Sequence, residues 1–116
     1  MSDSAINFTK LEEMKDVMGE IFIQLIPAYL EQSDEMIVEM QELLSSGTID
    51  TLERHAHSLK SSSLNVGAEE LGEIARELED MCRNNDNTEL LHEKIIALTE
   101  EYAKAKTGLQ GYMQSN

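Results

Sequence analysis

The chain is poor in the residues that build disulfides, sheets and tight turns. Its 116 residues include no tryptophan, one cysteine and one proline, and aromatic residues make up 4% of the sequence. Six glycines supply few turns for an all-β fold, whereas leucine, isoleucine and methionine are abundant, which favours packed helices. The lone cysteine, Cys82, has no partner for an internal disulfide, which is typical of a protein from a reducing compartment.

Positive charge is also scarce. The chain has 9 basic and 23 acidic side chains, for a formal net charge of −14 at pH 7. Such a surface repels nucleic-acid phosphates and anionic lipids, so neither nucleic acid nor a membrane is an expected partner. The N-terminus lacks a signal-peptide pattern, and no apolar run approaches the roughly 18 residues of a membrane-spanning helix. With 41% hydrophobic residues, the sequence predicts one folded domain over residues 1–116, located in the cytoplasm.

The N-terminal part of the chain predicts an arm followed by a short helix. Residues 1–8 carry no periodic apolar pattern and are expected to form a loose arm. Thr9 and Glu12 have the spacing of a capping box, in which the glutamate reaches back to the amide of the threonine. The helix that starts there is expected to end near Gly19.

Apolar residues at spacings of three and four predict a long second helix and a third helix. The second helix carries its stripe from Phe22 to Leu44, and Pro27 inside it is expected to kink or interrupt it. The third helix is expected to cover residues 49–65, with the chain turning at Gly67.

Two further apolar stripes predict a fourth and a fifth helix. The fourth ends at an asparagine-rich turn, residues 84–87, and the fifth extends to Tyr112. Gly108 and Gly111 are expected to fray its last turns. Long helices with short connections predict an all-α fold, an antiparallel up-and-down four-helix bundle with a short additional N-terminal helix.

His57 is the most informative residue of the third helix. At about 100° per residue it lies roughly 140° from Leu52 on the apolar stripe, so its ring is expected to face outward. Lys60 and Ser61 lie three and four residues further on, the positions that neighbour His57 on a helix surface, and Leu64 shares the same outer ridge. An exposed imidazole beside a cation and a small residue can be reached by a phosphate group on another macromolecule.

Simpler interpretations apply to the other candidate residues. A lone histidine on a helix is most often an ordinary surface residue, which is the interpretation for His55 and His92. A metal site is not expected, because His55 and His57 lie about 200° apart on a helix and cannot bind one ion together. Cys82 lies on an apolar stripe, where a buried and inert thiol is the expectation. The cationic and small neighbours of His57 favour a function for that histidine.

The segment around His57 resembles a known signature. It runs AHSLKSSSLNVGA from Ala56 to Ala68 and is followed by Leu71. This resembles the pattern of the histidine-containing phosphotransfer (HPt) family: His-x-Leu-Lys-Gly-Ser-Ser/Ala, then an apolar residue, Gly-Ala and a leucine. The pair Leu78-Glu79 resembles a position on the following helix of that family. Nearly the whole chain agrees with the helical bundle that the family forms.

The resemblance implies that His57 accepts a phosphoryl group from the aspartate of one receiver domain and passes it to the aspartate of another. A neutral imidazole is a competent nucleophile near pH 7. Lys60 is placed to offset part of the charge on the phosphoryl oxygens. Glu79 matches the position from which family members use a Gln or Glu to orient the ring. The implied partners are response-regulator receiver domains and a hybrid sensor kinase.

The rest of the site is also interpreted through the resemblance. The sequence has no glycine-rich phosphate loop and no Mg²⁺-holding acidic motif, so we expect a phosphocarrier without ATP-dependent kinase activity and without a cofactor of its own. The Mg²⁺ would be supplied by the partner receiver domain. Ser61, Leu64 and Gly67 are expected to contact that partner. The family usually has glycine in place of Ser61, and the added hydroxyl leaves three outcomes open: slower transfer, a narrower choice of partner, or a hydrogen bond to the phosphoryl group.

Two other functions remain open from the sequence. One is a non-catalytic helical adaptor whose acidic bundle binds a basic partner, with His57 incidental. The other is the dimerisation and phosphotransfer part of a sensor histidine kinase, which usually has an acidic residue directly after the histidine. Here Ser58 follows. Because the chain is long enough to close a four-helix core alone, a monomer is favoured.

Overall fold

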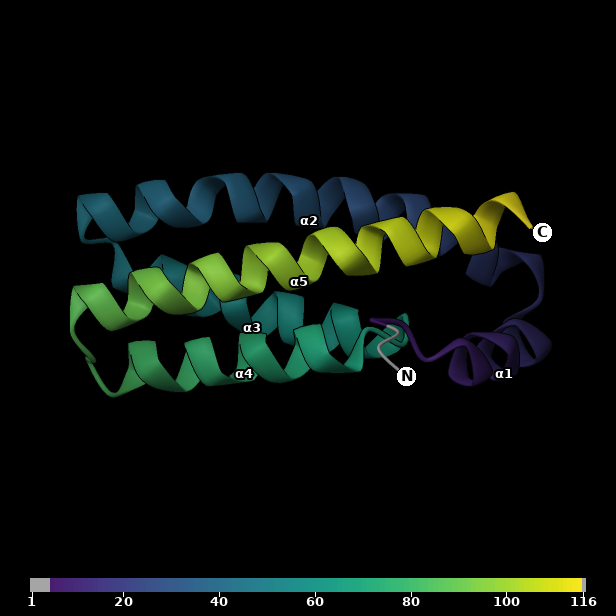
Figure 1. Ribbon diagram of the computed structural model, residues 1–116, viewed down its shortest axis with the longest axis horizontal. Coiled ribbons are helices and arrows are strands. Elements are labelled where there is room, and N and C mark those ends of the chain that lie inside the picture. The colour runs from purple at the N-terminus through teal and green to yellow at the C-terminus, as the bar shows by residue number, and fades with distance from the viewer. Residues whose placement is uncertain (1–4, 116) are drawn as a thin grey trace.

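The computed structural model describes residues 5–115 of the chain, which form five α-helices. These are α1 (Phe8–Met18), α2 (Glu20–Ser46), α3 (Ile49–Asn65), α4 (Glu69–Arg83) and α5 (Thr88–Gln114). Figure 1 shows α2, α3, α4 and α5 packed along one axis, each running opposite to the helix before it. The predicted all-α fold, an antiparallel four-helix bundle with a short N-terminal helix, is confirmed.

The apolar stripes of the four long helices face one another and form one buried core. Met40 of α2, Leu52 of α3, Leu78 of α4 and Leu98 of α5 are each fully buried. Burying a side chain of this kind stabilises the fold by about 1.5–3 kcal/mol. Burial of apolar surface in this core is therefore the main contribution that holds the helices together. Within residues 5–115 no helix is long and apolar enough to cross a bilayer.

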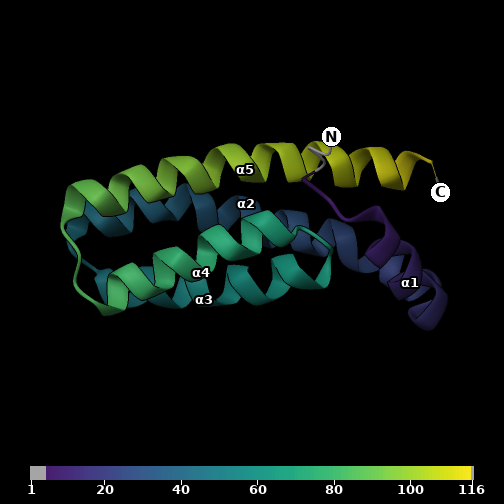
Figure 2. The same cartoon turned by 60° about the horizontal axis from the view of Figure 1, so that its bottom comes forward.

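α1 lies at the end of the bundle and begins two residues earlier than predicted (Figure 2). Its N-cap is Asn7, whose side-chain oxygen accepts a hydrogen bond from the Lys10 amide at 3.1 Å. Thr9 lies inside the first turn, so the predicted capping box of Thr9 and Glu12 is wrong. Asparagine caps at least as well as threonine. The backbone N–H of Asn7 also donates a hydrogen bond to the carbonyl oxygen of Gly67 at 2.8 Å, which fixes this residue in place.

The predicted loose arm (residues 1–8) is wrong for residues 5–8. Ile6 is buried, with 2% of its surface exposed, and packs against Gly108 of α5. A Cβ added to that glycine would lie 2.9 Å from Ile6 Cγ1. A segment this short is unable to show an apolar period, which is why the sequence does not predict its burial. Residues 1–4 of the predicted arm lie outside the described part of the chain.

The last turns of α5 are packed instead of frayed. Gly108 and Gly111 led to the prediction of fraying, yet the helix continues to Gln114. Tyr112 is buried, and its ring centroid lies 6.3 Å from that of Phe8. The glycine at position 108 therefore makes room for the N-terminal segment, and that segment in turn holds the end of α5.

Pro27 does not interrupt α2, which runs continuously from Glu20 to Ser46. The proline is exposed. Proline has no backbone N–H, so the carbonyl of Ile23, four residues earlier on the same face, loses its helical hydrogen-bond donor. A water molecule can donate to that carbonyl instead. The predicted break is absent because the lost hydrogen bond does not lie in the core.

Candidate functional site

α3 and α4 approach each other closely near the end of α3. A Cβ added to Gly72 of α4 would lie 2.8 Å from Leu64 Cδ2 and 3.4 Å from the Lys60 carbonyl oxygen, so glycine permits this spacing. Leu64 rests on Gly72 and still exposes 39% of its surface. It therefore packs against α4, although the sequence predicted only a partner contact. The same approach brings Glu79, two turns further along α4, alongside α3.

Glu79 is the buried polar centre of the site, with 4% of its surface exposed. Its Oε1 accepts a hydrogen bond from Lys60 Nζ at 2.8 Å, and its Oε2 lies 2.7 Å from His57 Nδ1. Burial alone would raise the pKa of Glu79, but the hydrogen bonds of Lys60 and His57, together with the positive charge beside the carboxylate, outweigh it and lower the pKa to about 2. Glu79 is therefore a carboxylate at neutral pH.

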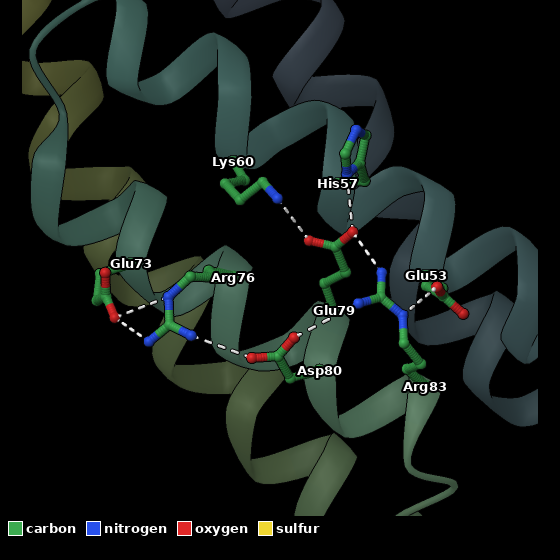
Figure 3. A network of polar contacts seen from close by, with 8 residues as sticks. All are labelled: Glu53, His57, Lys60, Glu73, Arg76, Glu79, Asp80 and Arg83. Carbon is green, nitrogen blue, oxygen red and sulfur yellow. Dashed lines mark hydrogen bonds and ion pairs between the residues drawn. The ribbon is translucent and has the colours of Figure 1, made fainter.

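His57 faces outward from α3, as predicted, and 61% of its side chain is exposed. Figure 3 shows the ring joined to the Glu79 carboxylate through Nδ1, with the rest of the ring directed away from it. Because a carboxylate only accepts hydrogen bonds, the proton of the neutral ring is assigned to Nδ1. Nε2 then carries the free lone pair on the exposed side of the ring.

Arg83 joins the site although the sequence did not predict it. One guanidinium nitrogen donates to Glu79 Oε2 at 2.9 Å, and Nε donates to Oε2 of Glu53 on α3 at 3.2 Å. The available signal was the spacing, since Arg83 lies four residues after Glu79 on α4 and so neighbours it on the helix surface. Figure 3 shows His57, Lys60 and Arg83 arranged around one carboxylate.

The three predicted partner-binding residues have different surroundings. Ser61 is exposed on α3, one turn after His57, and remains open to a partner. Gly67 is buried, has a φ of +78°, and lies under Asn7, whose carbonyl oxygen would be 3.0 Å from an added Cβ. Its predicted contact with a partner is wrong, because the N-terminal segment covers it. Gly67 instead closes the turn between α3 and α4.

The other two histidines have partners on exposed surfaces. His55 Nε2 lies 2.7 Å from Glu39 Oε1 of α2, and that carboxylate side chain is 53% exposed. His92 Nδ1 lies 3.1 Å from Gln41 Oε1, on the surface between α5 and α2. Neither resembles His57, whose partner is a buried carboxylate that also binds cations.

Cys82 is buried, as predicted, and burial, with the charges of Glu53 and Glu79, raises the pKa of its thiol to about 11. The thiol is therefore protonated and unreactive near neutral pH. Among the described residues, no three His, Cys, Asp or Glu side chains converge as metal ligands.

Two hollows lie along α3, and one of them is lined by the histidine. A polar one of about 360 Å³ includes His57, Glu53, Arg54 and Arg83 in its lining. An apolar one of about 380 Å³ lies between α1, α2 and α3; the lining side chains are Met14, Met18, Phe22, Leu25, Ala28, Tyr29, Gln32, Ser62, Asn65 and Val66. The sequence did not predict the apolar hollow, because it forms only where α1 folds back on α2.

Comparison with known proteins identifies the family. The family model that describes the Hpt domain matches residues 24–108 of this chain. The crystal structure of histidine-containing phosphotransfer protein B from Pseudomonas aeruginosa is 25% identical and superposes with a TM-score of 0.88, covering 99% of both chains. Histidine-containing phosphotransfer protein 1 of Arabidopsis thaliana is 24% identical over 106 residues, which cover 89% of this chain and 68% of the plant protein. A maize histidine-containing phosphotransfer protein shares the fold, with 19% identity, a TM-score of 0.80 and coverage of 94% and 87%.

The family match includes both helices of the site. Residues 24–108 contain all of α3 and α4, and therefore His57, Lys60 and Glu79. The match covers well over half of the chain, and the fold agrees over nearly its full length. The chain belongs to the Hpt domain family and is a phosphorelay intermediate, which carries phosphoryl groups from one protein to another.

Proposed function

We propose that His57 is the phosphoacceptor, which takes a phosphoryl group on Nε2 from one receiver-domain aspartate and gives it to another. The observation that carries this proposal is the exposed ring whose Nδ1 lies 2.7 Å from the buried Glu79 carboxylate. One ring nitrogen is held and oriented, and the other is left facing solvent as the nucleophile. His55 and His92 lack a buried carboxylate of this kind.

The transfer step follows from that arrangement. The lone pair of His57 Nε2 attacks phosphorus, a P–N bond forms, the P–O bond to the aspartate breaks, and its electron pair leaves with the aspartate carboxylate. Nδ1 keeps its proton, so the ring becomes cationic, and Glu79 stabilises that charge through the 2.7 Å contact. Transfer to the second receiver reverses these bonds, and the ring departs as neutral imidazole.

Lys60 stabilises the phosphoryl oxygens in this proposal. It lies one turn after His57, its side chain is 25% exposed, and its Nζ is 2.8 Å from Glu79 Oε1. From there the ammonium group can turn toward the phosphoryl group on Nε2, where negative charge is spread over three oxygens. Glu79 thus has two roles, because it orients the ring and keeps the lysine beside it.

The remaining apparatus is assigned to the partner. The sequence has no nucleotide-binding loop, so we expect no ATP-dependent kinase activity and no cofactor held by this chain, with Mg²⁺ supplied by the receiver domain. The proposed partners are response-regulator receiver domains and a hybrid sensor kinase. We expect a monomer, because the four long helices already bury their apolar stripes in one another.

The apolar hollow is the proposed docking surface for the receiver domain. Its lining includes Ser62 and Asn65, which follow His57 by five and eight residues on α3, and in this proposal a receiver domain that covers the ring extends over the hollow. Leu25 on its rim is 44% exposed. An apolar side chain that stays exposed at an apolar hollow indicates a partner contact.

Leu25→Glu is expected to lower the rate of phosphotransfer at subsaturating receiver concentration by about tenfold, equivalent to about 1.4 kcal/mol of binding energy. The saturating rate should change little, because His57 is untouched. The matched control is Val38→Glu, which adds the same charge to an exposed apolar position of α2, about 20 Å further along the helix. Equal effects of both variants, measured by transfer rate against receiver concentration, would contradict docking at the hollow.

The proposed function is tested by incubating the purified chain with a panel of radiolabelled phospho-receiver domains. We expect label on the chain that is lost in acid and retained in alkali, as a phosphohistidine requires. No label from any receiver, with the chain shown to be helical and folded, would contradict the proposal and favour the adaptor interpretation. ATP alone should give no label.

A further inference from the structure

The three consecutive serines of α3 differ in their hydrogen-bond partners. Ser63 is buried, and its Oγ lies 2.7 Å from the hydroxyl oxygen of Tyr29. Ser62 Oγ donates to the carbonyl oxygen of Ser58, four residues earlier, at 3.0 Å, which is a common bond for a serine inside a helix. Ser61 is exposed, and within the described part of the chain its hydroxyl has no hydrogen-bond partner. Its donor is therefore available to another molecule.

Ser61 neighbours His57 on the surface of α3. It follows the histidine by four residues, so the Cβ atoms of the two residues lie about 5–6 Å apart. Helical side chains lean toward the N-terminus of their helix, which directs the Ser61 side chain toward the ring. The ring itself is 61% exposed and is held only through Nδ1. A group attached to its other nitrogen is therefore within reach of the serine hydroxyl.

The serine and the lysine lie on two sides of the histidine. At about 100° per residue, Lys60 lies about 60° from His57 around α3 in one direction, and Ser61 lies about 40° from it in the other. Figure 3 shows Lys60 directed toward Glu79 of α4, where its Nζ is 2.8 Å from Oε1. A phosphoryl group on Nε2 would thus have a cation on the side of α4 and a hydroxyl on the other side.

We propose that the Ser61 hydroxyl donates a hydrogen bond to the phosphoryl group carried on His57 Nε2, and that this bond favours the phosphorylated state of the chain over that of the receiver domain. The inference rests on the proposed function, since it assumes that His57 is the phosphoacceptor. It assigns to Ser61 a part in deciding which of the two proteins holds the phosphoryl group at equilibrium.

The hydrogen bond is present on one side of the transfer equilibrium only. In the phosphorylated chain the hydroxyl donates to an oxygen that carries negative charge, and such bonds are stronger than those between neutral groups. During transfer the P–N bond breaks, its electron pair stays on Nε2, and a P–O bond forms to the receiver aspartate. The hydroxyl then returns to water. Removing it therefore shifts the equilibrium toward the phosphorylated receiver.

Exchange with water limits the size of this shift. The hydroxyl of an exposed serine already bonds to solvent, so only the difference between the two bonds contributes. We expect a shift of about fivefold in the equilibrium constant, equivalent to about 1 kcal/mol.

A purely steric role for Ser61 gives a different result. A side chain that only obstructs the receiver domain slows transfer equally in both directions, because the separated proteins before and after transfer have the same free energies as without the obstruction. The ratio of the forward and reverse rate constants then stays unchanged. This ratio distinguishes a hydrogen bond to the phosphoryl group from an obstruction.

The test compares the wild type with Ser61→Ala and Ser61→Gly, and uses one receiver domain first as acceptor and then as donor. Alanine removes the hydroxyl and keeps Cβ, whereas glycine removes both. The matched control is Ser58→Ala, which removes an exposed hydroxyl directly after His57, at a position that does not face it on the helix. The measurement is the second-order rate constant of label transfer in each direction, and the ratio of the two is the equilibrium constant. Circular dichroism of each variant checks that it is folded.

We expect Ser61→Ala and Ser61→Gly each to raise the equilibrium constant for transfer to the receiver by about fivefold, while Ser58→Ala keeps the wild-type value. A wild-type ratio in Ser61→Ala, whether or not both rates change, would overturn the inference, and so would an equal shift in Ser58→Ala. Failure of the wild-type chain to accept phosphate on His57 would instead overturn the proposed function.

Discussion

Replacing His57 with glutamine is expected to abolish phosphoryl acceptance and leave the fold intact. The substitution removes the only ring nitrogen that the structure pairs with a buried carboxylate, within residues 5–115. Glutamine is a good helix former, and 61% of the histidine side chain is exposed, so the bundle loses almost no packing. The measurement is transfer of label from a phospho-receiver, with circular dichroism and thermal unfolding recorded on the same sample.

His55→Gln is the matched control for that experiment. It removes a histidine two residues earlier on α3, one that pairs with the exposed carboxylate of Glu39. We expect it to accept label at the wild-type rate. Persistent labelling of the His57→Gln protein, or loss of labelling in His55→Gln alone, would contradict the assignment of His57.

Replacing Glu79 with alanine is expected to have the second largest effect, because it removes the acceptor for three donors at once. His57 loses the group that orients its ring and stabilises its positive charge, and Lys60 loses the group that holds it nearby. Removing an orienting partner of this kind from metal-bound histidines costs about 10–100-fold. We expect a fall of the same order in the saturating rate of phosphotransfer, with receiver binding little changed.

The same substitution should reduce stability only moderately. The side chains of His57 and Arg83 are more than half exposed, and Lys60 is 25% exposed, so water can replace part of what the carboxylate provided. We expect a loss of about 1–2 kcal/mol, equivalent to a fall in melting temperature of about 4–8 °C. Glu79→Gln should fall between wild type and alanine in transfer rate, since it keeps an acceptor but loses the charge.

Glu77→Ala is the control for Glu79→Ala. It removes another carboxylate of α4, which pairs with Lys94 of α5 and touches neither His57 nor Arg83. Its transfer rate should equal that of the wild type. A Glu79→Ala protein that transferred phosphate at the wild-type rate would show that the 2.7 Å contact with Nδ1 has no part in the reaction.

The helices were predictable because each long helix has a continuous apolar stripe. The third helix was expected over residues 49–65 and is observed at Ile49–Asn65. The outward direction of His57 also follows from its angular position around that helix relative to Leu52, because the burial of Leu52 defines the face that packs on the core. These inferences depend on periodicity within a single helix, which the sequence carries directly.

Contacts between helices were harder to predict. Glu79 was named from the family resemblance alone, because periodicity does not say which side chain of α4 meets which side chain of α3. The close packing at Gly72 decides that register, and the sequence shows only a glycine there. Arg83 was missed for the same reason, since its link to Glu53 crosses from one helix to the other.

Short segments were the other source of error. Ile6 and Asn7 belong to a stretch with no periodic pattern, yet they cover Gly108 and Gly67. Burial of Gly67 removed a predicted partner contact, and burial of Tyr112 removed a predicted frayed end. In each case a single side chain or backbone group fills a space left by a glycine, which depends on the tertiary fold and not on local sequence.

The central claim is that His57 accepts phosphate on Nε2 while Glu79 holds the proton on Nδ1. The most direct measurement is nuclear magnetic resonance of the ¹⁵N-histidine-labelled chain after phosphorylation by a receiver domain. We predict phosphorus coupling at Nε2 of His57, with its Nδ1 resonance still that of a protonated nitrogen near neutral pH. Phosphorus on Nδ1, or on His55 or His92, would contradict the account.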